Sequence, residues 1–164
     1  MGVGMTWRNQ EPNKCPFGRH GSGHGTQSGA LDGHICAGSE SKSKSKEVRE
    51  FAQLMVTDHS GVNKSASELV QKLHVTPESN AISQSLQKGG DDNLSALKKL
   101  SGRAFDNAYV DHEIAYHQAV LDAVDTTLIP SAQNAELKAL LIKVRPAFVA
   151  HLDHAKHLKA DLAK

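Results

Sequence analysis

Three histidines, His59, His117 and His151, occupy inward-facing positions on three separate predicted helices. Each takes one place in a stripe of apolar residues that recurs every three or four positions, the spacing of one helix face. A buried imidazole needs a polar partner, and the carboxylates considered for this are Asp58, Asp106, Asp111, Glu113 and Asp153. Imidazole and carboxylate together suit Zn, Fe, Cu or Mn.

The position of the last hairpin decides which of these side chains can meet. We expect the chain to reverse near Leu128, between the last two helices. At a rise of ~1.5 Å per residue, His117 and His151 are then about 18 Å apart along the hairpin. This spacing excludes a metal shared by the two and predicts two separate layers. His117 lies in the layer nearer the hairpin, and the other layer holds His59, Asp106, Tyr109 and His151. This second layer indicates either a metal or proton-transfer site, or a structural layer of hydrogen bonds that fixes helix register.

The last helix carries a second histidine pattern. His151, His154 and His157 follow one another at intervals of three, so they are neighbours on a helix surface. Either His151 and His154 chelate a divalent ion at the surface, or the face is simply exposed and rich in histidine. The candidate metal ligands are therefore His59, Asp106, Tyr109, His117, His151 and His154, and the candidate cofactor is a divalent transition metal.

Several enzyme classes can be tested against the sequence directly. Di-iron carboxylate bundles need Glu-x-x-His on two helices, and no histidine here has a glutamate three residues before it. No Gly-rich phosphate loop, Gly-x-Ser-x-Gly elbow or catalytic Cys/His context is present. We therefore predict no catalytic or cofactor-binding residue beyond the metal candidates, and favour a protein that is not an enzyme.

Hydrophobic periodicity predicts an all-α antiparallel bundle over residues 47–164, with three strong helices and one weak one. Gly89 and Gly90 are expected to interrupt the weak helix, and Thr127–Ser131 to form a short connection. Pro146 should bend the last helix locally. The predicted helical segments are Lys46–Leu73, Glu78–Lys88, Asp91–Leu100, Arg103–Thr126 and Ala132–Leu162.

Residues 1–46 differ sharply in composition and are predicted to be disordered, because such a segment buries too little apolar surface to order itself. They hold both cysteines and most of the glycines. Cys15 and Cys36, with the three nearby histidines, either form a small metal site or are incidental; their spacing fits no known zinc pattern. The formal net charge of +1 and the lack of a basic cluster argue against nucleic-acid binding. No apolar run is long enough to span a membrane, and residues 1–38 lack the apolar core of a signal peptide.

The stretch from Val48 to Leu162 resembles a bacterial family of unknown function, often labelled "predicted outer membrane protein". Four segments carry the resemblance: Phe51–His59, Leu100–Val110, Ala115–Val120 and Pro146–Leu152. It implies a ferritin-like four-helix bundle, export to the periplasm or cell envelope, and no established reaction. The family's motif positions fall on His59, Asp106, Tyr109, His117 and His151.

The N-terminus departs from this family, whose members carry a signal peptide and then a first long helix that residues 1–45 do not supply. An open apolar trough would result, to be covered by a second copy or a helical partner. We expect a non-enzymatic envelope or stress-related module that binds metal through a buried His/Asp layer. The alternatives are a metalloenzyme with redox or hydrolytic chemistry at His59, Asp106 and His151, or a partner-binding scaffold.

Overall fold

The computed structural model describes residues 42–76 and 79–164, and the predictions made for residues 1–41 lie outside this part of the chain. The described part is helical and contains no strand, which confirms the predicted fold class. Its long helices are α2 (Lys46–Lys72), α3 (Ala81–Leu97), α4 (Gly102–Ala123) and α6 (Ala135–Leu162). In the described residues, every helix is too short or too polar to span a membrane.

Side chains at the helix starts explain where the helices begin. Ser45 accepts a hydrogen bond from the backbone N–H of Val48, and Asn134 accepts from two N–H groups at the start of α6. Asn80 and Ser83 form a reciprocal capping box at the start of α3. Such caps satisfy N–H groups that have no partner within the helix, and each typically stabilises it by ~1 kcal/mol.

The weak helix is continuous, so the predicted interruption at Gly89 and Gly90 is wrong. A glycine inside a helix costs only about 1 kcal/mol relative to alanine. The capping box at the start of α3 and the packing of Leu97 in the core offset that cost. The break falls later, where the chain turns into α4 at Gly102, whose φ of +56° suits glycine.

The predicted connection at Thr127–Ser131 is also wrong, because these residues continue the helix that begins as α4. A π-helical turn, η1 (Val124–Leu128), follows α4 and leads into the short α5 (Ile129–Ser131). The N–H of Ile129 bonds to the carbonyl of Val124 five residues back. Pro130 lies in α5, inside this continuing helix, and has no N–H to donate to the preceding turn. The chain reverses only at residues 132–134.

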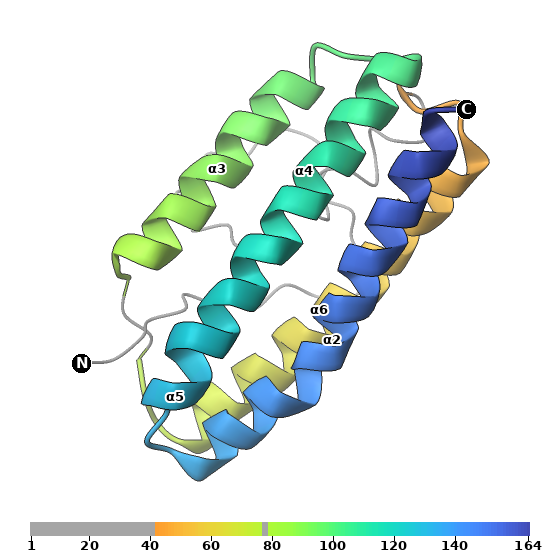
Figure 1. The fold of residues 1–164 in the computed structure, drawn as a ribbon. Helices are drawn as coiled ribbons and strands as arrows, with labels where there is room; N and C mark the ends of the chain where they lie inside the picture. The colour runs from red at the N-terminus through yellow and green to blue at the C-terminus, as the bar shows by residue number, and fades with distance from the viewer. Residues whose placement is uncertain (1–41, 77–78) are drawn as a thin grey trace.

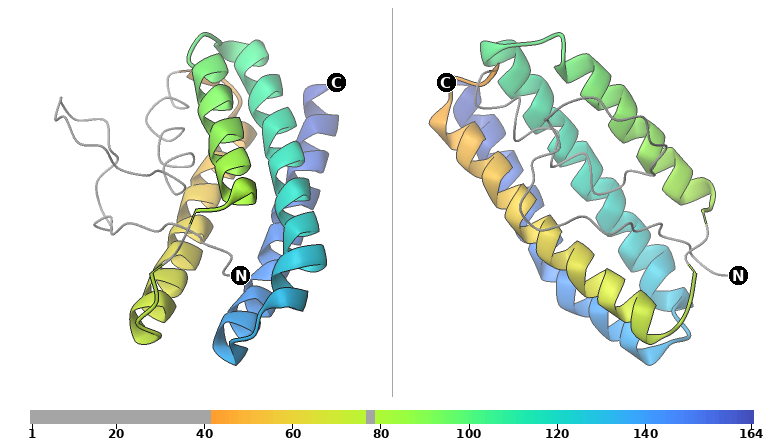
Figure 2. Two further views of the ribbon diagram at one scale, coloured as in Figure 1. Left: turned by 90° about the vertical axis from the view of Figure 1, so that its left-hand side faces the viewer. Right: turned by 180° about the vertical axis from the view of Figure 1, so that it is seen from behind.

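The long helices alternate in direction, with α2 and α4 running one way and α3 and α6 the other. In Figure 1, α4 lies between α3 and α6, and α2 lies behind α6; Figure 2 shows the same arrangement from two other sides. Side-chain contacts fix the alignment of α4 with α6. Arg145 pairs with Asp125 near the hairpin, Lys159 with Asp111 farther up, and Arg103 donates to the carbonyl of Leu162 at the far end.

The main apolar core lies in the half of the bundle where α2 begins and α6 ends. Phe51, Tyr109 and Val110 are at most 1 % exposed there. The complete cluster consists of Val48, Phe51, Ala52, Met55, Leu97, Phe105, Tyr109, Val110, Ala155 and Leu158. The same faces of α2, α4 and α6 continue toward the hairpin, and histidines interrupt all three there.

Candidate metal centre

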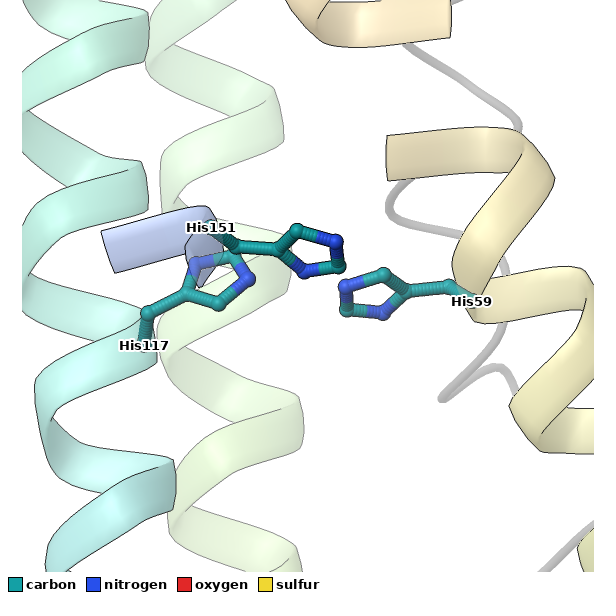
Figure 3. A group of neighbouring side chains, drawn as sticks. All are labelled: His59, His117 and His151. Atoms are coloured by element: carbon teal, nitrogen blue, oxygen red, sulfur yellow. The ribbon is translucent and has the colours of Figure 1, made fainter. Parts of the chain in front are cut away.

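The three stripe histidines meet in the interior, each from a different helix. His59 comes from α2, His117 from α4 and His151 from α6, and each offers one ligand atom within 4.8 Å of the other two. Their ring centroids are 5.4–5.5 Å apart. Figure 3 shows ring nitrogens of all three turned toward a common point. This is the only group of its kind among the residues that the structure describes.

The prediction that His117 and His151 occupy separate layers is therefore wrong, because the chain reverses later than expected. With the turn centred on Gln133, the two histidines lie at almost the same distance from it, within ~3 Å along the helix axes. The extra helical residues of η1 and α5 move His117 up the hairpin to the level of His151.

His117 is fully buried, and its hydrogen bond selects one tautomer of the neutral ring. Nδ1 lies 2.9 Å from the backbone carbonyl oxygen of Glu113, and 3.5 Å from the Glu113 carboxylate. A carbonyl oxygen can only accept, so Nδ1 carries the proton and donates it. The neutral ring then has its lone pair on Nε2, which is buried on the side of the other two histidines.

His151 is oriented in the same way by a carboxylate. Its Nε2 lies 2.8 Å from Oδ2 of Asp58, which sits next to His59 on α2. A carboxylate accepts from Nε2–H, so the lone pair of the neutral ring lies on Nδ1. Metal-binding histidines usually donate their second N–H to a carboxylate or a carbonyl in this manner. Of the five carboxylates considered from the sequence, Asp58 and Glu113 are the ones beside these rings.

Aromatic rings surround the histidines. Phe148, one turn before His151 on α6, is edge-on to the His59 ring at a centroid distance of 5.7 Å and lies 6.1 Å from His117. Tyr116 meets His117 edge-on at 5.9 Å. An apolar wall of this kind lowers the local dielectric and strengthens electrostatic interactions inside it.

The other candidate ligands lie elsewhere. Tyr109 is two turns from His117, ~12 Å along α4, and packs against Phe51 and Phe105 in the apolar core. Asp106 is buried on the same helix, and the metal-ligand group does not include it. His154 is exposed and sits edge-on to Phe51 with a centroid distance of 4.9 Å.

The donor set fits a transition metal. A tetrahedral zinc ion with bonds of ~2.0–2.1 Å needs its nitrogens about 3.4 Å apart, so small ring rotations would close the observed group around an ion. Imidazole donors suit Zn, Cu, Fe and Ni, whereas Mg and Ca require oxygen donors. The fold and site thus define an all-helical bundle with a candidate three-histidine metal centre.

One protein-family model matches most of the chain. The model of a family described as "Domain of unknown function (DUF4142)" matches residues 33–158. The chain belongs to this family, which confirms the predicted resemblance to a family of unknown function. The ferritin-like fold and the outer-membrane label, which the resemblance implied, stay predictions. No curated protein and no solved structure matches the chain.

Proposed function

We propose that this domain binds one divalent transition-metal ion through His59, His117 and His151. The observation that carries the proposal is the meeting of three imidazoles from three helices, two of which have hydrogen bonds that leave the inward nitrogen with the lone pair. Two inward lone pairs cannot hydrogen-bond to each other, and His59 turns a ring nitrogen toward the same point. A transition-metal cation is the partner that such a set of imidazole nitrogens binds.

Metal analysis of the untagged full chain tests this proposal. The purified protein is stripped with a chelator, loaded with Zn²⁺, dialysed and analysed for metal content. We expect about one ion per chain, since three imidazole donors that meet from three helices should hold zinc against dialysis. His117→Ala should retain none. His154→Ala is the matched control, because His154 lies outside the group, and it should retain the ion. Equal retention by wild type and His117→Ala would refute the site.

The wider role follows from the family resemblance. We propose a metal-binding module of the periplasm or cell envelope, and the family resemblance supports this location. Fractionation of cells that make the protein, followed by detection with an antibody, tests the location. Recovery in the cytoplasmic fraction alone would contradict it.

A further inference from the structure

We propose that a metal ion at this centre keeps one coordination position open to a small exogenous ligand, either water or an inorganic anion. This inference rests on the proposed metal binding and goes one step further, because it assigns the centre a ligand of its own. A site with three protein donors and one exchangeable position is the arrangement of catalytic zinc centres, whereas structural zinc sites close all four positions.

The group consists of three histidines, and no carboxylate or thiolate of the described residues joins it. Tetrahedral ions of the first transition row take a fourth ligand. In this part of the chain, that ligand has to come from solution.

The nearest carboxylates lie on the outer side of the histidine rings. Asp58 accepts from Nε2 of His151, and the Glu113 carboxylate lies beside Nδ1 of His117. In both rings these are the nitrogens that face away from the centre. A carboxylate bound at the outer nitrogen cannot reach an ion held by the inner one. Asp58 and Glu113 are therefore positioning residues that orient the ligands, and the fourth position stays free of them.

The surroundings limit the size of the ligand. His117 and His151 are buried, whereas His59 is only half-buried, so α2 forms the more accessible side of the centre. The Nε2 atom of His59 is itself shielded from solvent, and Phe148 packs against the same ring. This burial favours a ligand of a few atoms that enters beside His59.

The chemistry of the donors favours a reactive bound water. Neutral imidazoles donate less charge to an ion than thiolates or carboxylates, so the ion remains a strong Lewis acid. Zinc in such a set lowers the pKa of its bound water to about 7. An inorganic anion would displace that water one for one, without any change in oxidation state.

Cobalt substitution tests the open position. The full chain is stripped, loaded with Co²⁺ and titrated with sodium azide while the visible spectrum is recorded. We expect intense d–d bands typical of four-coordinate cobalt, and a saturable shift of these bands as azide replaces water. His154→Ala, a surface control, should behave like wild type.

The experiment distinguishes a failure of metal binding from a failure of the open position. If wild type retains neither Co²⁺ nor Zn²⁺, the proposed metal binding fails and this inference fails with it. If cobalt binds but azide leaves the bands unchanged, metal binding stands and the open position is refuted. A thiolate-to-cobalt charge-transfer band would refute it as well, because a cysteine of the chain would then be the fourth ligand.

Discussion

Two adjacent regions of the same three helices differ in what fills them. Toward the start of α2, the stripes meet as Phe51, Tyr109 and Leu158, which are almost completely buried and apolar. Two turns farther along α2, they meet as His59, His117 and His151. The apolar layer stabilises the bundle mainly through burial of apolar surface. The histidine layer has to satisfy polar atoms as well, so its stability depends on Asp58, Glu113 and, on our proposal, an ion.

The largest loss of stability is expected from a substitution in the apolar layer. Phe51→Ala removes a fully buried ring that contacts Tyr109, and should lower the free energy of unfolding by ~3–5 kcal/mol. Urea unfolding measures the change. Leu54→Ala, on the same helix but 38 % exposed, is the matched control and should cost far less. Similar losses in both variants would show that this layer is not the main source of stability.

Metal binding at the histidine layer should have the next largest effect on the stability of the folded chain. Zinc that binds only the folded chain adds ~2.7 kcal/mol at a free concentration one hundred times its Kd. The melting temperature of wild type should rise with zinc, and that of His117→Ala should not. Phe51→Ala should keep the rise, because its site is intact. An equal rise in wild type and His117→Ala would place the zinc elsewhere.

Asp58 should tune the metal affinity without being a ligand. Asp58→Asn keeps the size of the side chain but removes the charge that orients His151, and should weaken zinc binding by ~10–100-fold. Competition with a chromophoric chelator measures the affinity. Asp153→Asn, a charge-matched change at an exposed site of α6, should leave it unaltered. A full loss of binding in Asp58→Asn would mean that Asp58 contacts the ion directly.

A smaller effect is expected at the end of α3. The Lys42 ammonium donates to the carbonyls of Leu97, Lys98 and Leu100, which lie where the helix ends. Lys42→Ala should cost about 1 kcal/mol in urea unfolding. Zinc affinity should stay the same, because the contact lies at the opposite end of the apolar core from the histidines. A change in zinc affinity would show that the end of α3 and the histidine layer are energetically coupled.

The smallest effect is expected near the hairpin, and it depends on pH. The Arg145 guanidinium lowers the pKa of Asp125, chiefly by hydrogen bonding and further by its charge, while burial opposes this. A lowered folded-state pKa stabilises above the unfolded value, and this contribution is lost as pH falls through the folded value. Asp125→Asn should therefore melt slightly below wild type at pH 7, and the difference should vanish in acid. Because the pair is exposed, salt should also weaken it. A difference that persists in acid would rule out the ion pair as its cause.

Local patterns in the sequence determined most of the helices and all three histidines of the centre. The three-four spacing identifies α2, α4 and α6, because a helix buries one face and that face repeats with the helical period. The same argument places His59, His117 and His151 on buried faces, without reference to any other helix. Asp58 and Glu113 were also among the carboxylates that the sequence offered as partners.

Tertiary structure decided which of these residues meet. The sequence contains Pro130, which signals a helix end, and only the folded chain shows that η1 and α5 carry the helix past it before the chain reverses. A shift of about five residues in the turn moves paired positions on an antiparallel hairpin by ~15 Å, twice the shift of the turn itself. This is why His117 and His151, expected in separate layers, share one, while Asp106 and Tyr109 lie outside it. Alignment between helices depends on side-chain contacts such as Arg145 with Asp125, which no periodicity within a single helix encodes.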